Sequence, residues 1–579
     1  MLDLPVSWPL WLISGALFLW FATRVRARLL LSRAKHPSLR GHAKISRWVA
    51  RRVPPYTVPE AEYFRADGAP ESVERERRAG FMRLSQLLTE RHAKSVQLTA
   101  QAAPYLSDLQ FTGAYRVPPP FAALVRANLK TGAFVERSAG VKLIDVDGQE
   151  LYDLSGSYGV NLFGYDFYKE CLSEAFTRVQ ELGPVLGSYH PVLLSNVERL
   201  RRISGHDEVS FHMSGTEAVM QAVRLARYHT RKTHLVRFCG AYHGFWGDVQ
   251  PGVGNPVPAH ETYTLRDMDA RALAVLRARS DIACVLVNPL QGLHPNQNAP
   301  SDNALLDSTR RAGFDRDAYT RWLVQLREVC TQRGIALIFD EVFVGFRLAP
   351  GGAQEYFGVR ADLVTYGKTL GGGLAVGVVC GGKKWMKRFD ESHPADICFA
   401  RGTFNSHPHV MAAMHAFLSR LETPAVRALY ADLDARWDAR AARLNAALAA
   451  ESLPIRVHNL STIWTVCYTQ PSRYNWMLQY YLRAEGLALS WVGTGRFIFS
   501  LDYSEADFEA VLQRFVSAAR NMRADGFFWA DAALTTWAIK RRLLRELSAS
   551  LWRPPSPSAL QPAPAAHRAA QPAEPGGRA

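Results

Sequence analysis

Residues 335–341 restrict the fold most strongly, because they join a continuous apolar run to two acidic side chains. The run follows Gly334, reads Ile-Ala-Leu-Ile-Phe, and ends in Asp340 and Glu341. A short apolar run of this kind is typical of a parallel strand that is buried on both faces. Acidic residues at the carboxyl end of such a strand lie where open α/β sheets bind ligands. The stretch therefore predicts an α/β fold with a ligand site beside Asp340.

A lysine between an apolar run and three glycines marks a second position of this kind. Lys368 follows the apolar residues 361–366, and residues 371–373 are all glycine. Glycines let the backbone approach a neighbouring group closely, and a lysine amine in a pocket of low polarity becomes a nucleophile toward carbonyls. Taken alone, Lys368 could be a surface lysine before a flexible loop, and Asp340 could cap the next element. Together they favour a Schiff-base lysine and an acid that serve pyridoxal phosphate.

Further motifs surround these two residues. They are Asp-Glu-Val at 340–342, Gly-Phe-Arg at 345–347, Gly-Ala-Gln-Glu at 352–355, and Gly-Lys at 367–368 before the glycine triplet. In combination they resemble class III, fold-type I pyridoxal-phosphate aminotransferases, and most closely the glutamate-1-semialdehyde aminomutase-like group. The resemblance extends over residues 121–522. It implies a large, mostly parallel sheet domain and a smaller C-terminal α+β domain, preceded here by N-terminal helices.

The resemblance also implies roles for individual residues. Lys368 would hold the cofactor and act as the general base, and Asp340 would keep the cofactor's ring nitrogen protonated. Small residues at the start of a helix that runs to about Tyr228 would seat the phosphate, since a helix N-terminus attracts anions; an ordinary helix cap is the alternative. The cofactor-binding residues expected in addition to Lys368 and Asp340 are Ser214, Gly215, Thr216, Tyr242 over the ring, His243, Val342 and Thr403.

Three residues are expected on the substrate side. Ser157 and Tyr158 occupy positions at which relatives line the substrate entrance, with simple packing as the alternative. Asn288 follows the apolar run 282–287 at a position where relatives usually carry Glu. Phe343 and Val344 likewise stand where some relatives carry a polar partner for the ring hydroxyl. These departures leave the choice of amino donor and substrate open.

Thr403 has a further implication, because its family counterpart reaches the cofactor phosphate of the neighbouring subunit. A homodimer with shared active sites is therefore expected. No metal site is expected, because the seven cysteines are scattered without a CxxC pair. That scatter also disfavours a disulfide framework and fits a reducing compartment.

The N-terminus combines an apolar segment with a basic one. Residues 6–22 are almost wholly apolar, and ten Lys or Arg but no acid follow between Arg24 and Arg52. Seventeen residues are the short limit for a membrane-spanning helix, and Trp8, Trp11 and Trp20 suit positions near its ends. Because the charges follow the apolar segment, an uncleaved anchor with a cytoplasmic catalytic body is favoured over a signal peptide. A helix buried against the enzyme body is the alternative.

The net charge of +16 fits the same interpretation. Such a charge can indicate nucleic acid, an anionic membrane surface or an acidic substrate, but no nucleic-acid motif with interleaved aromatic residues is found. We therefore expect a membrane-associated protein that does not bind nucleic acid.

The expected segments follow from these observations. They are a membrane anchor (1–23), a basic and then charged helical extension (24–114), an N-terminal segment of the enzyme (115–160), a large cofactor-binding domain (161–420), a small C-terminal domain (421–524), a basic amphipathic helix (525–552) and a disordered tail (553–579).

Three functions remain possible from the sequence. The first is ping-pong transfer of an amino group from an amine donor to an aldehyde or ketone, with a lipophilic or biosynthetic-intermediate substrate. The second is an intramolecular aminomutase, as the closest likeness implies. The third is an inactive scaffold on a membrane, which the presence of Lys368 and Asp340 disfavours.

Overall fold

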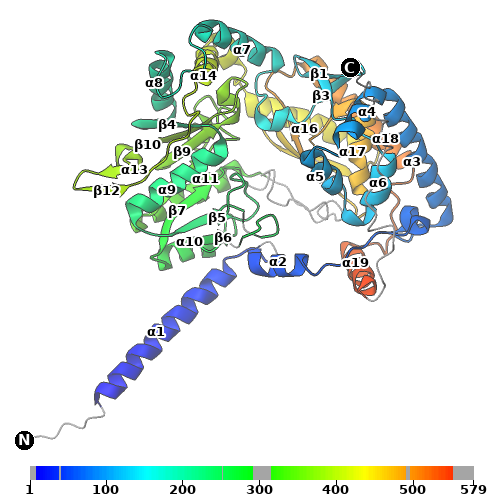
Figure 1. The fold of residues 1–579 in the computed structure, drawn as a ribbon. Coiled ribbons are helices and arrows are strands. Elements are labelled where there is room, and N and C mark those ends of the chain that lie inside the picture. Colours follow the sequence, from blue (N-terminus) through cyan, green and yellow to red (C-terminus); the bar gives the residue numbers. More distant parts are fainter. Residues whose placement is uncertain are drawn as a thin grey trace, which may run out of the picture.

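A computed structural model describes residues 8–37, 41–250, 252–257, 259–290, 314–490 and 496–551, with side chains from residue 12 onward (Figure 1). The expected disordered tail at 553–579 lies outside the described residues, and so does the start of the expected anchor. The boundaries of the expected segments remain predictions.

A seven-stranded sheet forms the centre of the larger part of the molecule. Its strand order is β4-β10-β9-β8-β7-β5-β6, and β10 alone is antiparallel to its two neighbours. The mostly parallel sheet expected from the sequence is therefore confirmed. The strands are β4 (Glu208–His212), β5 (His234–Phe238), β6 (Thr262–Leu265), β7 (Ile282–Val287), β8 (Ala336–Asp340), β9 (Leu363–Gly367) and β10 (Gly377–Gly381).

The apolar runs of the sequence form the inner strands of this sheet. Every residue of β7, β8 and β9 is buried, because helices cover both faces of the sheet and no face meets water (Figure 1). The helices of this part are α7 (Tyr165–Val179), α8 (Val192–Ser204), α9 (Gly215–Thr230), α10 (Ala270–Ala278), α11 (Arg316–Arg333), α12 (Gly352–Phe357), α13 (Lys383–Met386) and α14 (Pro408–Leu421). A two-stranded hairpin, β11 (Phe389–Asp390) and β12 (His393–Ile397), projects from its edge.

The smaller part contains two further sheets. One has the order β13-β14-β16, and the other has the order β1-β2-β3-β15. The strands β2 and β3 form an antiparallel hairpin whose turn contains Asp147 and Gly148. The strands are β1 (Val135–Ala139), β2 (Lys142–Asp145), β3 (Glu150–Asp153), β13 (Ile455–Leu460), β14 (Ile463–Tyr468), β15 (Leu487–Ala488) and β16 (Arg496–Ile498), and the helices are α15 (Pro424–Ala428), α16 (Leu433–Ala450), α17 (Leu478–Ala484) and α18 (Glu505–Ala524).

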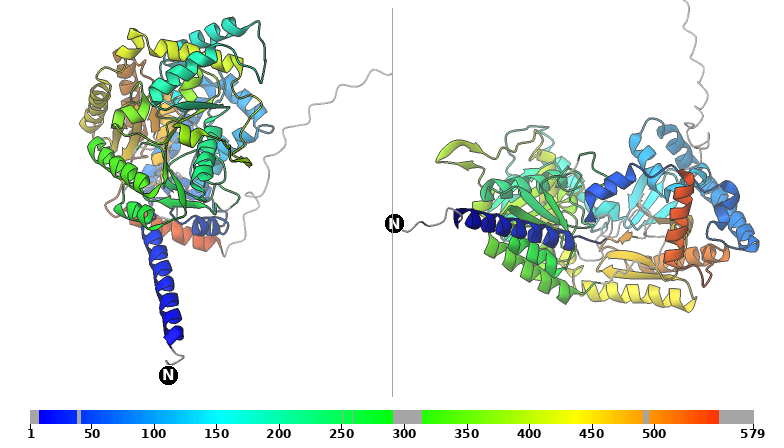
Figure 2. Two further views of the ribbon diagram at one scale, coloured as in Figure 1. Left: turned by 90° about the vertical axis from the view of Figure 1, so that its left-hand side faces the viewer. Right: turned by 90° about the horizontal axis from the view of Figure 1, so that it is seen from below.

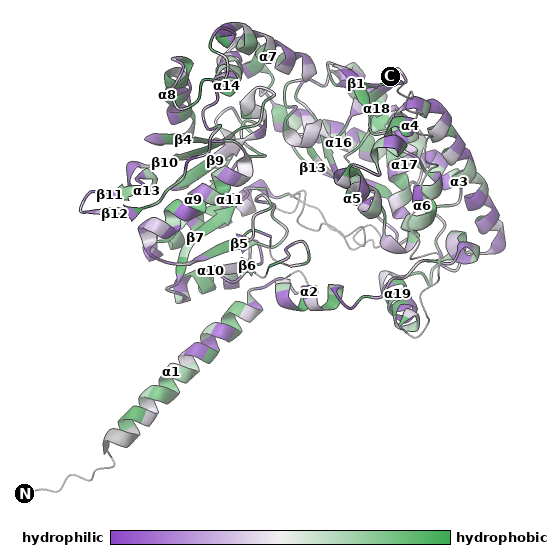
Figure 3. Cartoon of the chain, in the orientation of Figure 1, coloured by the Kyte–Doolittle hydropathy of each residue, from purple (hydrophilic) through white to green (hydrophobic). Residues whose placement is uncertain are grey.

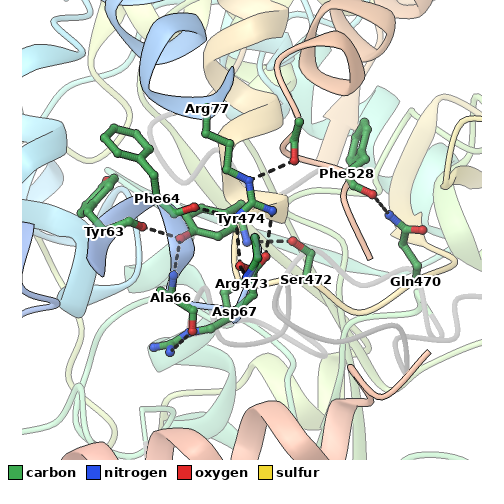
Figure 4. Close-up of polar contacts among 12 residues, drawn as sticks. Tyr63, Phe64, Ala66, Asp67, Arg77, Gln470, Ser472, Arg473, Tyr474 and Phe528 are labelled. Atoms are coloured by element: carbon green, nitrogen blue, oxygen red, sulfur yellow. Dashed lines mark hydrogen bonds and ion pairs between the residues drawn. The ribbon is translucent and has the colours of Figure 1, made fainter. Parts of the chain in front are cut away.

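The N-terminal extension packs on this smaller part through a buried arginine (Figure 4). Arg77 donates from Nε to the Gly526 carbonyl over 2.9 Å and forms two bonds, of 2.9 and 2.8 Å, with the Asp67 carboxylate. Its guanidinium also lies 4.3 Å from the centre of the Tyr474 ring. The elements of the extension are η2 (Glu60–Arg65), α3 (Glu71–Arg91), α4 (Ala93–Ala102), α5 (Ser107–Tyr115), η3 (Pro119–Phe121) and α6 (Ala122–Asn128).

Two helices lie along one outer side of the molecule, and a third projects from the same side (Figure 2). They are α1 (Trp8–Arg33), α2 (Ala43–Ala50) and α19 (Thr536–Ser550). The transmembrane helix expected at 6–22 is not supported: in the part of the chain that the structure describes, no helix is both long and apolar enough to cross a membrane. The physical reason lies in α1, which continues beyond the apolar segment through Arg24, Arg26 and Arg28.

Nor is α1 buried against the enzyme body. Side chains from Leu12 to Phe21 are exposed, and only the base of the helix packs on the body. There Ala34 is fully buried, and its carbonyl accepts a hydrogen bond of 2.9 Å from the Arg266 amide.

Candidate active site

Four parallel strands end beside one another and bring the expected site residues to one edge of the sheet. The strands β9, β8, β7 and β5 are consecutive neighbours. Asp340 ends β8 and is paired with Thr365 of β9, three residues before Lys368. Asn288 directly follows β7, and Tyr242 follows β5 by four residues. Carboxyl ends of parallel strands meet at the same edge, so residues far apart in the sequence face one region.

Asp340 is the best supported of these side chains. It is buried, and its Oδ2 lies 2.7 Å from Nδ1 of His243, which is also buried. Its Oδ1 accepts from the amide of Val342 over 3.1 Å and from Thr365 Oγ1 over 3.3 Å. Burial lowers the pKa of His243, so the neutral ring that donates its Nδ1 proton to the carboxylate fits this pair. His243 therefore orients Asp340.

Lys368 occupies a dehydrated position with a left-handed backbone. Its φ is +47°, and its Nζ lies 5.7 Å from the centre of the Phe343 ring. Burial lowers the pKa of Lys368; Asp340 opposes this effect and Arg347 adds to it. A lysine with a lowered pKa carries a larger fraction of free amine, the form that attacks a carbonyl carbon.

The glycine triplet after Lys368 lies against two neighbouring helices. Gly372, at φ +60°, leaves no room for a side chain against the Ala413 carbonyl of α14. Gly373, at φ +104°, lies against Leu172 of α7. The glycines thus let α14 and α7 pack closely against the turn that follows the lysine.

A tightly packed helix N-terminus lies beside Lys368 at the start of α9. Ser214 is the N-cap of α9 and accepts from the Glu217 amide over 3.3 Å, and Glu217 Oε2 accepts from the Met213 amide over 3.0 Å. Any side chain at Gly215 would collide with Val342. Gly215 therefore lets Val342 pack closely against the start of the helix, where the first amides and the helix dipole favour negative charge.

The residues on the substrate side lie over the lysine. A side chain at Gly159 would collide with the Phe343 ring and would lie 3.5 Å from Cδ of Lys368, which places this segment against the site. The preceding residues Ser157 and Tyr158 have left-handed φ values of +44° and +57°. Such backbone costs about 1–3 kcal/mol per residue and is often found at active sites.

Hydrogen bonds hold that strained segment. Ser157 Oγ lies 2.8 Å from the hydroxyl of Tyr165, which donates to Asp153 Oδ2 over 2.7 Å. Tyr158 is exposed and is therefore accessible to a substrate. The half-exposed Tyr242 lies near Asp340: burial, and then the Asp340 carboxylate, raise the pKa of its hydroxyl.

Two further expected site residues, Asn288 and Thr403, lie at the periphery of this group. Asn288 is buried at the end of β7, and its Oδ1 has no hydrogen-bond partner among the described residues. It borders a small cavity shared with Asp267, whose pKa burial raises to about 7. Thr403 is exposed on the segment 401–407. Phe404 and His407 of that segment line an open groove of about 580 Å³ that also reaches His212 and Met213, next to Ser214.

Two supporting residues were missed from the sequence. Thr365 donates a hydrogen bond to Asp340. The signal that could have revealed this role was a hydroxyl residue within the buried strand β9, next to β8. Arg347 is buried and donates from Nη1 to the Phe499 carbonyl over 2.7 Å and to Thr462 Oγ1 over 2.9 Å, and from Nη2 to the Gly159 carbonyl over 3.4 Å. Its partners lie more than 100 residues away in sequence, so no local signal announced this role.

These residues fit pyridoxal phosphate. The amine of Lys368, with its lowered pKa, matches the aldehyde of that cofactor. The buried Asp340 carboxylate, held by three donors, matches the ring nitrogen, and the N-terminus of α9 matches the phosphate. No set of three or more potential metal ligands is present among the described residues.

Comparisons with known proteins agree with this geometry. The family model "Aminotransferase class-III" matches residues 124–249 and 312–519. Glutamate-1-semialdehyde 2,1-aminomutase of Nitratidesulfovibrio vulgaris (strain DP4) is 35% identical over 355 residues, which cover 58% of this chain and 77% of that protein.

Solved structures give the same result. A transaminase with pyridoxal phosphate bound is 25% identical, with a TM-score of 0.59, and the match covers 75% of this chain and 99% of that one. A glutamate-1-semialdehyde-aminomutase from Pseudomonas aeruginosa PAO1 is 20% identical with a TM-score of 0.61, covers 77% and 99% of the two chains, and shares the fold. The chain therefore belongs to the class-III aminotransferases, which are pyridoxal-phosphate-dependent enzymes of fold-type I.

Proposed function

We propose that this enzyme moves an amino group between neighbouring carbons of one small amino-carbonyl substrate, as an aminomutase of the glutamate-1-semialdehyde type does. The observation that carries the amino-transfer chemistry is the presence in one site of Lys368, with its lowered pKa, and of the buried Asp340. The intramolecular form is supported by the 35% identical relative, which bears the name glutamate-1-semialdehyde 2,1-aminomutase.

The proposed mechanism assigns a separate task to each side chain. Pyridoxal phosphate, when bound, supplies an electron sink for negative charge on the carbon that carries the nitrogen. Lys368 Nζ would hold the cofactor through its aldehyde carbon and would take the proton from the substrate carbon. Proton transfer by a positioned group typically accelerates a step by about 100- to 10,000-fold.

The neighbouring residues hold and orient the cofactor in this proposal. Asp340 would keep the proton on the ring nitrogen, and His243 and Thr365 fix the direction of its carboxylate. Tyr242 would pack against the ring, because an aromatic face packs well against another ring. Ser214, Gly215 and Thr216 would hold the phosphate at the start of α9.

A second candidate is transfer of the amino group from a separate donor to an aldehyde or ketone. Asn288 and Phe343 favour it, because they remove a charge and add an apolar ring at positions close to the site. An apolar wall of this kind suits a lipophilic acceptor. The family membership and the retained Lys368 and Asp340 both favour an enzyme over an inactive scaffold.

The assembly and the surroundings of the enzyme form part of the proposal. Thr403 lies on an exposed segment beside the groove near Ser214, which supports a homodimer in which this segment completes the partner's site. Exposed apolar side chains on α1 support association with a membrane through the N-terminal segment. The basic residues that follow the apolar segment support a catalytic body on the cytoplasmic side.

The test is a comparison of single-substrate and two-substrate turnover by purified enzyme. We expect glutamate-1-semialdehyde to be converted without any added amino donor, at a rate that adding amines does not raise. Turnover that requires a donor and accepts a long-chain aldehyde would instead establish the second candidate. The visible absorbance of bound cofactor, measured in the same preparation, separates a wrong substrate from an unloaded enzyme.

A further inference from the structure

Helix α1 presents apolar side chains in all directions. The exposed fractions of Phe18 and Leu12 are both 72%, and residues 17–21 are five consecutive exposed apolar residues. Five consecutive positions cover more than one helical turn of 3.6 residues. A helix that is apolar all round is normally surrounded by a protein core or by lipid. Figure 3 shows α1 projecting away from the body, where no described segment surrounds it.

The outer side of α19 is also apolar. Trp537, Leu544 and Leu551 recur at seven-residue intervals, which places them on one side of the helix, and all three are exposed. The opposite side is tied to the body, since Ile539 is buried and Glu546 forms two bonds, of 2.8 and 2.9 Å, with Arg473. The apolar side of α19 therefore faces away from the body.

The short helix α2 repeats this arrangement. Ile45 and Trp48 are exposed and lie three residues apart on its outer side. The side chain of Arg47 fastens the helix to the body through a hydrogen bond of 2.7 Å to the Pro256 carbonyl.

Each of these helices carries an arginine over a tryptophan four residues earlier. The distance from the guanidinium carbon to the ring centre is 4.5 Å for Arg24 and Trp20 in α1, and 4.4 Å for Arg52 and Trp48 at the end of α2. It is 5.1 Å for Arg541 and Trp537 in α19. Tryptophan favours the boundary between lipid and water, and arginine there pairs with headgroup phosphates.

The three helices lie on the same side of the molecule. Figures 1 and 2 show α2 and α19 along one side of the body, with α1 projecting from that side. We call this surface, formed by residues 12–29, α2 and the outer side of α19, the basal face. Its cations repel a second basal face, and no acidic residue lies between Arg24 and Arg52 to compensate them.

We propose that the basal face binds an anionic lipid bilayer, with α1 inserted among the acyl chains and α2 and α19 lying at the headgroups. This inference rests on the membrane association proposed above and names its surface and lipid class. Residues 12–21 rise about 15 Å, roughly half of the 30 Å hydrocarbon thickness, so this part of α1 reaches into one leaflet. The three Trp–Arg pairs mark the level of the phosphates.

Fluorescent labels at single introduced cysteines test the proposal on the full-length enzyme. All seven native cysteines are buried, so an exposed new cysteine is the one that reacts. The test positions are Phe18→Cys on α1 and Leu544→Cys on α19, where the native side chains are 72% and 68% exposed. Leu194→Cys on α8, where leucine is 64% exposed, is the matched control far from the basal face.

The label is environment-sensitive, and the probes are vesicles of phosphatidylcholine with and without phosphatidylserine. We expect a blue shift at positions 18 and 544 with the anionic vesicles, a weaker one without phosphatidylserine, and none at position 194. A shift at 18 without one at 544 would leave membrane association standing and overturn the basal face. No shift at either position would overturn both. A shift that appears without vesicles as the protein concentration rises would indicate a second copy as the occupant and would also overturn the proposal.

Charge reversal provides an independent measurement. In co-sedimentation with anionic vesicles, Arg541→Glu/Arg545→Glu should weaken binding by about tenfold or more, since each cation near an anionic surface contributes to affinity. The control Arg137→Glu/Arg201→Glu changes the net charge equally on β1 and α8, away from the basal face. Equal losses in the two variants would show that net charge alone drives binding, which contradicts a specific face.

Discussion

The catalytic centre and the contact between the extension and the small domain both bury charge, but they use it differently. At the contact, every nitrogen of Arg77 that can donate is occupied by Asp67, Phe64 or Gly526. At the catalytic centre, the amine of Lys368 has a lowered pKa, and Nε2 of His243 has no hydrogen-bond partner among the described residues. A saturated charge stabilises the fold, whereas an incompletely satisfied one stays available for chemistry.

The largest effect is expected for Lys368→Ala. It should reduce turnover by about a thousandfold or more and abolish the visible absorbance of bound cofactor, because no other amine takes its place. The free energy of unfolding should not fall, since a buried amine is costly to dehydrate. Turnover and spectra are compared with those of Lys384→Ala, which removes an exposed lysine. A fully active Lys368→Ala enzyme would refute the assignment.

Arg77→Met should lower the free energy of unfolding, which Lys368→Ala should not. We expect a loss of about 3–5 kcal/mol in urea unfolding, because Asp67 is left buried without its counter-ion. Arg75→Met on the same helix is the control: its partner Glu71 is exposed, so less than about 0.5 kcal/mol is expected. Adding Asp67→Leu to Arg77→Met should restore part of the loss, and a further loss in the double variant would contradict this account.

Glu341 is a second buried carboxyl group, one residue away from Asp340. Its carboxylate oxygens accept from the amides of Ala353 and Gln354 and so hold the start of α12. Burial raises its pKa from 4.5 to about 8. Its contribution to stability is therefore full below about pH 4.5 and is lost as the pH rises toward 8, by at most about 1.4 kcal/mol per pH unit. Unfolding measured at several pH values should show this slope in the native enzyme and not in Glu341→Gln.

The smallest effect is expected for Thr365→Val. The change removes one hydrogen bond of 3.3 Å to Asp340 and leaves the bonds from His243 and Val342 in place. A loss of about 0.5–1.5 kcal/mol, or roughly two- to tenfold in cofactor affinity, should follow. Titration of the cofactor-free protein measures it. A loss as large as that for Asp340→Asn would mean that Thr365 contacts the cofactor directly.

The parts of the site that the sequence predicted share a local cause. Asp340 ends one strand and Lys368 follows another, and the apolar residues of each strand indicate that it is buried. Ser214 caps its helix by bonding to a residue three positions away. The parts that the sequence did not reveal depend on distant contacts. The ring of Phe121, for example, lies 5.6 Å from that of Tyr474, more than 350 residues later. The strand order and the role of the glycine triplet depend on such contacts too.

Arg347 has a consequence for how substrates enter. One guanidinium joins the loop after β8 to Thr462 and Phe499 of the small domain and to Gly159 above the lysine. A hinge that swung the small domain open would have to strip this buried cation of most of its partners at once, at a cost of several kcal/mol. Exchange of substrate and product is therefore expected to rely on local movement of exposed side chains such as Tyr158. The loop after β8, the small domain and the segment at Gly159 should move as one body.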